Sequence, residues 1–412
     1  LAARGVSFNR AYCNSSVCTP SRMSFITGKH VHEIASWGNG VPLDPAEMTW
    51  ARWLDRAGIP STLIGKMDFC GEYQDGGFTD HRIIRRRAAG APFPRTEPHR
   101  TRMPDYRWPA MPRRVSDPGP RTDAVISDGD WSDEHDPRIG DYDHDRIVTN
   151  WALEYLRRKS EERGRELWAC FVGLLMPHWP FRAPEAFYRR YYPDRVEWPV
   201  DCRFPNPDLH PAVLHYQRVL GLDAPPPREF LRQILAAYYG MVTCMDTLFG
   251  EILAELERHG LAGNTLVIYM SDHGEHLGEH GLFNKETAYE GSVGVPLILA
   301  GPGLPAGRTV DRPVSLIDLY PTVMDIFGLP VEPDRPGRSW LPLARNDPDE
   351  REDCVLSQYH GSFFTRDWSM LLRGDYKYVH YDGERPALFN LREDPDELSD
   401  LAGDPAQADR LA

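Results

Sequence analysis

The sequence predicts an α/β fold in which a large mixed, mostly parallel sheet is flanked by helices, with a small antiparallel α+β subdomain at the C-terminal end. Short apolar runs alternate with amphipathic helical stretches over most of the 412 residues, which is typical of this class. After about residue 340, strand-like segments follow one another and are joined by the turn sequences RGD and DGE. We therefore expect a main domain over residues 1–340 and the subdomain over residues 341–412.

The first part of the main domain contains two predicted strands. The opening residues, LAARGVSFNRAY, indicate the end of a helix that runs into a strand, and residues 48–69 indicate a helix, a turn and a buried strand. Residues 70 to about 140 show little periodicity and are rich in Pro, Gly, Arg and Asp, so we expect a long surface excursion such as a lid or an oligomer contact. We interpret its basic run, HRIIRRR, as a solvated or interface segment in preference to a site for an anionic substrate.

The remainder of the main domain alternates helices and strands more regularly. The apolar spacing predicts helices over residues 145–162, 230–260 and 315–329, and strands over residues 167–176, 265–272 and 295–303. In the subdomain, residues 368–391 predict strands joined by tight turns.

Composition argues against several classes of function. The formal net charge is −14, from 47 Lys and Arg against 61 Asp and Glu, which argues against general nucleic-acid binding. No apolar run is long enough to span a membrane, and no signal peptide is visible, which leaves the compartment open between bacterial cytoplasm and periplasm. The seven cysteines are scattered and contain no CxxC pair, so they indicate neither a zinc site nor a disulfide framework.

The stretch VCTPSRMSFITG, residues 17–28, places a cysteine where a helix begins. Pro20 suits the first position of a helix, and Met23, Phe25 and Ile26 then supply an apolar face at helical spacing. Cys18 would lie at the mouth of this helix, where free N–H groups and the helix dipole favour negative charge and where a cysteine can be an activated nucleophile. A buried structural cysteine is the alternative for such a residue taken in isolation.

The run CTPSR at residues 18–22, followed by Thr27 and Gly28, resembles the signature of the type I sulfatases, which belong to the alkaline-phosphatase-like superfamily. In its sequence pattern the chain most resembles the bacterial choline-sulfatase-like and arylsulfatase-like members of this family. The resemblance implies that residues 1–340 form the catalytic domain and that a formylglycine-generating enzyme oxidises Cys18 to formylglycine. Sulfatases usually begin with a strand that ends in paired aspartates. That strand is not in this sequence, and we expect it to belong to a missing first segment.

The second stretch that resembles the family is YMSDHGEHLGEHGLFNK, where a predicted strand delivers Asp272 and His273 to its carboxyl end, the usual ligand-binding edge of an α/β sheet. The resemblance implies that Asp272, His273 and residue 18 bind one divalent cation, with two further ligands on the missing strand. Carboxylate oxygen suits Ca²⁺, which we expect, or Mg²⁺, and a histidine nitrogen also admits Mn²⁺. A plain turn at the end of a strand is the alternative.

Two lysines and a histidine complete the predicted catalytic set. Lysine occurs at only five positions, 29, 66, 159, 285 and 377, so its retention in LIGKMDF and LFNKETAYEGS is informative. The resemblance implies that Lys285 contacts the sulfate oxygens and that Lys66 lies near the aldehyde, where both neutralise charge in the transition state. His178, in LLMPHWPF, matches the family histidine that protonates the departing alcohol. Exposed lysines and a packing histidine are the ordinary alternatives.

Asp68 departs from the family pattern, because the family usually has a histidine two residues after the lysine that Lys66 matches. Asp68 could act as the base that releases sulfate, or it could hold Lys66 in an ion pair. We expect Arg22 to orient the formylglycine hydrate and to add positive charge. Three further residues, in stretches that resemble the choline-sulfatase-like branch, are candidates for the substrate pocket, with loop or packing roles as the alternatives: Asn39, Tyr359 and His360.

These residues predict a hydrolase that cleaves the sulfate monoester of a small molecule. In the implied mechanism, one hydroxyl of the formylglycine hydrate attacks sulfur, the alcohol leaves with a proton from His178, and the second hydroxyl then loses its proton as sulfate is expelled. A phosphonate monoester or phosphodiester hydrolase of the same superfamily is the second hypothesis, and a catalytically impaired protein that keeps the fold is the third. Choline sulfate, aryl sulfates and sugar sulfates all remain open as substrates, and a homo-oligomer is possible.

Overall fold

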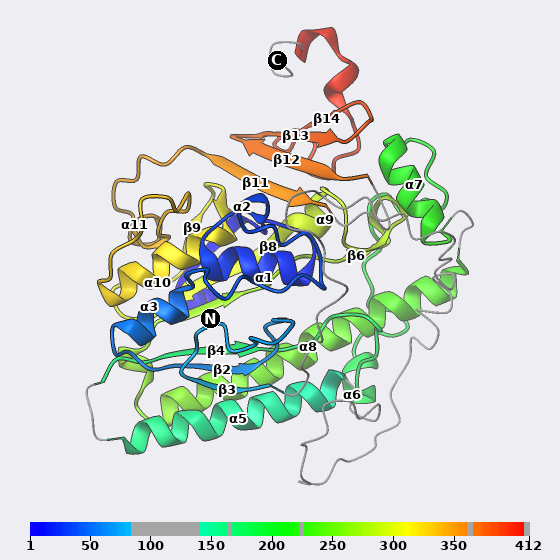
Figure 1. Ribbon diagram of the computed structural model, residues 1–412. Coiled ribbons are helices and arrows are strands. Elements are labelled where there is room, and N and C mark those ends of the chain that lie inside the picture. Colours follow the sequence, from blue (N-terminus) through cyan, green and yellow to red (C-terminus); the bar gives the residue numbers. More distant parts are fainter. Residues whose placement is uncertain (84–140, 163–165, 223–225, 361–365, 408–412) are drawn as a thin grey trace.

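The computed structural model describes residues 1–83, 141–162, 166–222, 226–360 and 366–407. In these ranges the chain has an α/β main part and, at one end, a four-stranded antiparallel sheet (Figure 1). Most of the expected surface excursion and of its basic run, residues 84–140, lies outside the described residues. The α/β class and the antiparallel C-terminal sheet are thus confirmed.

The first sheet is mixed. Its strand order is β10-β1-β8-β5, with β9 also paired to β1. The strands β9 and β10 run parallel to β1, whereas β8 runs antiparallel to both β1 and β5. The strands are β1 (Val6–Tyr12), β5 (Val267–Met270), β8 (Gly294–Ala300), β9 (Arg308–Val310) and β10 (Val314–Ser315). The expected helix at the start of the chain is only one 3₁₀ turn, Ala2–Arg4.

The second sheet is parallel and has the order β3-β2-β4, formed by Asp80–Arg82, Ser61–Gly65 and Ala169–Gly173. The prediction of a single large sheet is therefore wrong for the described residues, whose main part contains these two sheets and a separate two-stranded sheet of β6 (His276–Leu277) and β7 (Phe283–Asn284). Among the described strands, β4 pairs only with β2, and β5 pairs only with β8. The alternation of strands and helices in the sequence indicates the fold class. It does not indicate which strands pair, because pairing is decided by contacts between distant segments.

A cavity of about 1060 Å³ lies between β4 and β5. It is lined by both strands and by apolar side chains of α5 (Asp141–Glu161) and α8 (Arg228–Arg258). All five residues of β2 are buried, whereas the residues of β5 and most of those of β4 are only partly buried. The two strands that face this cavity therefore lack the cover that a central strand of a parallel sheet normally has.

The helices flank the sheets as the sequence predicts. The helix α5 runs below β2, β3 and β4 in Figure 1 and α8 packs against it, while α1 (Cys18–Thr27), α3 (Trp50–Arg56) and α10 (Leu319–Phe327) lie above these strands. Every residue of α1 is buried, so this helix belongs to the core and cannot be recognised from one apolar face. The short elements are α2 (Val31–Ile34), α6 (Glu185–Tyr188), α7 (Pro211–Val219), α9 (Glu290–Val293), α11 (Leu341–Arg345), β6 (His276–Leu277) and β7 (Phe283–Asn284).

The C-terminal sheet is a meander of β11 (Cys354–Tyr359), β12 (Trp368–Arg373), β13 (Tyr376–Tyr381) and β14 (Ala387–Asn390). Gly374 and Gly383 take positive φ values of 59° and 73° in the two predicted turns, a conformation that glycine adopts without strain. Sequence analysis found the last three strands and missed β11. The division of the chain at residue 340 stays a prediction.

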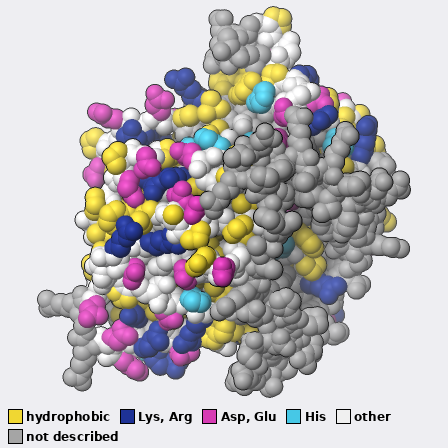
Figure 2. Space-filling view, in the orientation of Figure 1, with side chains coloured by type: hydrophobic (Ala, Val, Ile, Leu, Met, Phe, Trp, Pro, Cys, Tyr) yellow, Lys and Arg dark blue, Asp and Glu magenta, His cyan; other side chains and the backbone are white. Residues whose placement is uncertain are grey.

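On the face shown in Figure 2, the acidic and basic side chains of the described residues are interspersed. None of the helices in the described ranges combines the length and the apolar character that a membrane span requires.

Candidate active site

The helix α1 begins at Cys18 itself, two residues earlier than the sequence suggested. Pro20 is the third helical residue and not the first, which a helix tolerates because the N–H groups of its first turn have no partner within the helix. The Thr19 N–H, one of those groups, donates to Asn39 Oδ1 at 2.9 Å. Asn39 therefore caps this helix from the following loop and fixes the start of the segment that carries Cys18.

The end of β5 is attached to this first turn. The Ser21 hydroxyl donates to the carbonyl of Asp272 at 2.6 Å, and Arg22 Nε donates to the Asp272 carboxylate at 2.8 Å. Arg22 also donates through Nη1 to the Lys66 carbonyl at 2.9 Å. One buried arginine thus connects the segments that carry Cys18, Lys66 and Asp272.

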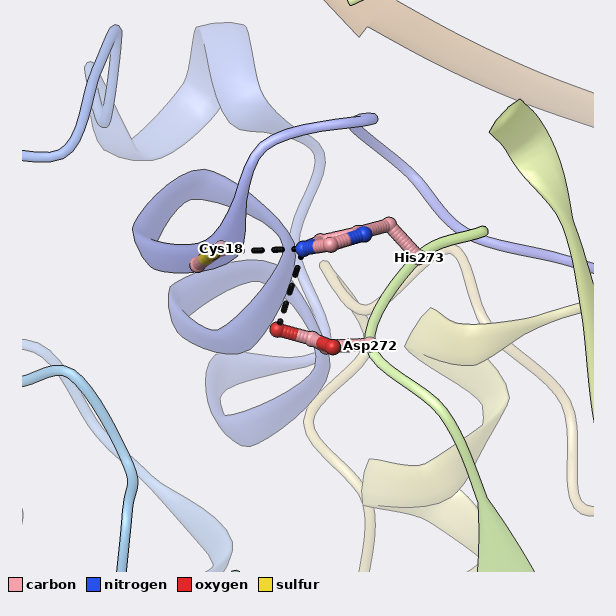
Figure 3. Close-up of side chains that lie close together, drawn as sticks. All are labelled: Cys18, Asp272 and His273. Carbon is pink, nitrogen blue, oxygen red and sulfur yellow. Dashed lines mark hydrogen bonds and ion pairs between the residues drawn. The ribbon is translucent and has the colours of Figure 1, made fainter. Parts of the chain in front are cut away.

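His273 faces the sulfur of Cys18 (Figure 3), and the ammonium group of Lys285 contacts the same sulfur. His273 Nδ1 lies 2.7 Å from the carbonyl oxygen of Gly274, so this nitrogen carries the proton and leaves Nε2 directed toward the site. His273 Nε2 lies 3.2 Å from Cys18 Sγ and 2.9 Å from Lys285 Nζ. Lys285 Nζ is itself 3.2 Å from Cys18 Sγ, and the side chain is buried.

Lys66 reaches the same sulfur from the end of β2. Its Nζ lies 3.8 Å from Cys18 Sγ and 3.3 Å from Asp68 Oδ2. Asp68 Oδ2 is also 3.6 Å from Arg22 Nε, and the Asp68 side chain is 7% exposed. Of the two roles considered for Asp68, the geometry matches the ion pair, because its carboxylate lies between two cations.

His178 is presented by a turn after β4. Its Nδ1 lies 2.6 Å from the Trp179 carbonyl oxygen and carries the proton of that hydrogen bond, while a side-chain hydrogen bond joins the ring to Cys18. Asp145, in the first turns of α5, accepts the N–H groups of Leu175 and Met176 at 2.6 and 2.8 Å. These are the residues before Pro177, so a buried carboxylate fixes the turn that carries His178.

Sequence analysis missed Asp145. It lies 30 and 31 residues before its two partners, and an acidic residue near the start of a helix is too common to be informative alone.

The site favours negative charge at position 18. Burial raises the pKa of the Cys18 thiol, but the Lys285 and Lys66 ammonium groups outweigh it and hold this pKa well below its usual range. Burial likewise opposes ionisation of Asp272, and Arg22 overcomes it, so the Asp272 pKa is lowered. In contrast, burial together with Lys285 lowers the pKa of His178, which leaves its ring neutral near pH 7.

A metal ion would find three donors here. Cys18 Sγ, an Asp272 carboxylate oxygen and a His273 ring nitrogen lie within 4.8 Å of one another, and they are the one such group of three or more among the described residues. These three donors can form only part of the coordination sphere of a divalent cation. Ca²⁺ takes six to eight oxygen ligands, so the other ligands must come from elsewhere. An oxygen at position 18 in place of sulfur would suit a hard cation better.

The three candidate pocket residues lie in different surroundings. Asn39 serves as the helix cap described above. Tyr359 is 2% exposed, with its ring stacked on Trp368 at 6.0 Å. The His360 ring meets Trp37 edge to face at 4.7 Å, and its Nδ1 lies 3.8 Å from an Asp367 carboxylate oxygen. Their role in substrate binding stays a prediction.

The comparisons with known proteins assign the family. A sequence model of the Sulfatase family matches residues 1–329, and a model described as the C-terminal part of N-sulphoglucosamine sulphohydrolase matches residues 278–411. The chain belongs to the Sulfatase family, and it is a hydrolase of that family.

Named relatives match nearly the whole chain. Arylsulfatase K of Canis lupus familiaris is 30% identical over 429 residues, which cover 98% of this chain and 73% of the relative. Choline-sulfatase of Rhizobium meliloti (strain 1021) is 30% identical over 423 residues, which cover 98% of this chain and 77% of the relative.

Solved structures share the fold. The phosphonate monoester hydrolase of Silicibacter pomeroyi has a TM-score of 0.76 at 25% identity, covering all of this chain and 86% of that one. A protein solved in complex with its substrate, D-glucosamine-2-N,6-O-disulfate, has a TM-score of 0.74 at 20% identity, covering all of this chain and 88% of that one.

Proposed function

We propose that this protein hydrolyses the sulfate monoester of a small molecule, and that residue 18 supplies the attacking group. The observation that carries the proposal is the pair of ammonium groups around position 18, with the buried Lys285 Nζ at 3.2 Å and the partly buried Lys66 Nζ at 3.8 Å from Sγ. Such a site binds a tetrahedral oxyanion and stabilises the charge that develops on it during transfer.

The reaction breaks the bond between sulfur and the ester oxygen. The new bond to sulfur comes from an oxygen that derives from water, the alcohol leaves with one proton, and sulfate is released. When formylglycine occupies position 18, its hydrate supplies the nucleophilic oxygen that an unmodified cysteine lacks. Lys285 and Lys66 bind the sulfate oxygens, and Arg22 fixes the Lys66 backbone through its carbonyl.

His178 is the proposed proton donor to the departing alcohol. Its Nδ1 is engaged with the Trp179 carbonyl, so the proton must come from Nε2, the ring nitrogen on the side of residue 18. A ring that carries protons on both nitrogens is therefore the acid form. The adjacent sulfate ester is negatively charged and favours that form when the substrate is bound.

Asp68 is proposed to hold Lys66 and not to act as the base. Its carboxylate lies 3.3 Å from Lys66 Nζ and 3.6 Å from Arg22 Nε, which limits the freedom of Lys66. Three cationic side chains and two carboxylates contact one another or residue 18 in this site. The cations are Arg22, Lys66 and Lys285, and the carboxylates are Asp68 and Asp272.

A divalent cation, with Ca²⁺ expected, would be held by Asp272, His273 and the oxygen at residue 18. Bound there, it would lower the charge on the group being transferred. The cavity between β4 and β5 reaches both Asp272 and His273, and two partly covered strands flank it. These features support the expectation that a further strand fits there and brings more carboxylates to the metal.

The substrate class follows from the relatives and from the site. Arylsulfatase K and choline-sulfatase carry names that denote sulfate esters, which supports a sulfate monoester here. The second candidate is a phosphonate monoester, favoured by the structural similarity to the Silicibacter pomeroyi hydrolase. Both groups present anionic oxygens to the same ammonium groups, so geometry alone does not separate them.

A paired rate assay tests the proposal. The protein is co-expressed with a formylglycine-generating enzyme, and kcat/KM is compared for an aryl sulfate and an aryl phosphonate monoester. We expect the sulfate to have the higher kcat/KM and Cys18→Ala to reduce it by at least about 10³-fold, because the nucleophile is lost.

Cys354→Ala is the matched control, because Cys354 is an exposed cysteine at the start of β11 and should leave the rate unchanged. Near-wild-type turnover in Cys18→Ala would refute the proposed nucleophile. A higher kcat/KM for the phosphonate would favour the second candidate.

A further inference from the structure

The segment that follows Lys285 is attached to the C-terminal sheet. Trp368 Nε1, from β12, donates to the Glu286 carbonyl at 3.1 Å, and Lys377 Nζ, from β13, donates to the Ala288 carbonyl at 3.1 Å. Both side chains are buried, with 1% and 0% of their surface exposed. Two donors from a distant part of the sequence therefore fix the backbone of residues 286–288.

A buried charge cluster extends this attachment to Glu290, the first residue of α9. Lys377 Nζ lies 2.5 Å from a Glu290 carboxylate oxygen and 2.8 Å from a Glu397 carboxylate oxygen. The other oxygen of Glu397 accepts the N–H of Glu290 at 2.6 Å. Tyr12 also donates to Glu290, at 3.2 Å. Lys377 is thus the common partner of both carboxylates and of the Ala288 carbonyl.

The same short helix holds Lys285 from its other side. The Ser292 hydroxyl, in α9, donates to the Lys285 carbonyl at 2.8 Å. A continuous set of contacts therefore runs from Lys377 through Glu290 and Ser292 to the backbone of Lys285. The ammonium group of Lys285 in turn lies 3.2 Å from Cys18 Sγ.

We propose that Lys377 is a positioning residue that fixes Lys285 in the active site, which makes the C-terminal sheet part of the catalytic apparatus. The inference rests on the proposed function, because it takes Lys285 as a sulfate-binding group. A displacement of about 1 Å in such a group can lower the rate about 100-fold, so a fixed backbone on both sides of Lys285 matters for catalysis. A buried ammonium that contacts Ala288 and Glu290 on this segment, and Glu397 outside it, is suited to that task.

The test compares double variants that each remove a buried ion pair. Lys377→Met alone would leave two carboxylates without their cation, which is strongly destabilising. Lys377→Met with Glu397→Gln removes one charge of each sign and keeps both side-chain shapes. The matched control is Arg351→Met with Asp349→Asn, a buried pair at 2.9 Å that does not bond to residues 285–292.

Two readouts are recorded in each protein alongside Lys285→Ala: kcat/KM on the preferred aryl ester, and hydrogen exchange of the amides in residues 286–292. In Lys377→Met/Glu397→Gln we expect kcat/KM to fall about 10-fold or more and those amides to exchange faster, because Lys285 loses its fixed position. The Arg351→Met/Asp349→Asn control should lose comparable stability, but its kcat/KM and its amide exchange in residues 286–292 should stay as in the wild type.

The outcomes separate this inference from the proposed function. If Lys285→Ala lowers kcat/KM while Lys377→Met/Glu397→Gln matches the control, the positioning role of Lys377 is wrong and the proposed function stands. If Lys285→Ala leaves kcat/KM unchanged, the role of Lys285 in the proposed function fails, and the inference fails with it. Should the double variant not fold, Trp368→Phe decides by the same readouts, because it removes only the donor to the Glu286 carbonyl and much of the ring is kept.

Discussion

At the scale of single residues, the position of a hydrogen determines what His178 can do. The Trp179 carbonyl requires a proton on Nδ1, so a neutral His178 has only a lone pair on Nε2 and cannot donate from it. Donation to a leaving alcohol needs the doubly protonated ring. Burial and Lys285 lower the His178 pKa below its usual value, which places the active form on the acid side of neutrality in the free protein.

A pH dependence follows from this. We expect kcat/KM for an alkyl sulfate to be highest at acid pH and to fall as pH rises through the lowered pKa of His178, because the proton donor is then lost. His178→Gln should remove that limb of the profile. For an aryl sulfate with a good leaving group, kcat/KM should depend less on the protonation of His178. A wild-type profile that rises through this range would contradict the assignment.

At the scale of elements, the ends of β2 and β4 must approach closely to place Lys66. Gly65 has φ of 86°, and the Lys66 N–H donates to the Gly173 carbonyl at 2.8 Å. A Cβ atom on Gly173 would lie 1.9 Å from the Lys66 carbonyl oxygen, which is the atom that Arg22 contacts. Glycine is therefore required at residue 173 by the neighbouring strand and not by its own backbone angles.

We expect Gly173→Ala to lower kcat/KM at least about 10-fold and to destabilise the fold by about 1–3 kcal/mol, because the Lys66 backbone must move. Gly250→Ala is the control. Gly250 lies within α8 with open space around its Cα, so alanine there should stabilise the protein by about 0.5–1 kcal/mol and leave the rate unchanged. Steady-state kinetics and urea unfolding measure both effects, and equal behaviour of the two variants would contradict the argument.

At the scale of the whole molecule, the predicted metal ligands come from segments that are distant in the sequence. Cys18 begins α1, whereas Asp272 and His273 follow β5, and Ser21 and Arg22 already join the two segments. A cation held by these residues would bind the folded chain and not the unfolded one. Its binding free energy would then add to the stability of the fold as a whole.

We expect Ca²⁺ at about 100 times its Kd to stabilise the matured protein by about 2.7 kcal/mol, seen as a higher Tm. Chelation should lower Tm and abolish sulfate ester hydrolysis, and added Ca²⁺ should restore both. In Asp272→Asn the Tm should no longer respond to Ca²⁺. A Ca²⁺ response that Asp272→Asn retains would show that the cation binds elsewhere.

The sequence by itself determined the local elements and the identity of the chemical groups. The apolar spacing predicted α5, α8 and the longer strands β1, β2, β4, β5 and β8, because periodicity reflects which side chains are buried. The short strands β3, β9 and β10 were not predicted. The CTPSR run and the DHG segment indicated the Sulfatase family, to which the chain belongs. Short-range patterns suffice for these features, since their causes lie within a few residues.

Only the tertiary structure decided how those groups are held. Asp68 lies between Lys66 and Arg22, Asp145 fixes the turn before His178, and Lys377 reaches Ala288 across 89 residues. The separation of β4 from β5 by a cavity also has no counterpart in the strand pattern. Each of these features depends on how segments that are distant in the sequence are placed relative to one another. A single sequence carries no direct record of such contacts, because hydrogen bonds and ion pairs depend on distances that exist only after folding.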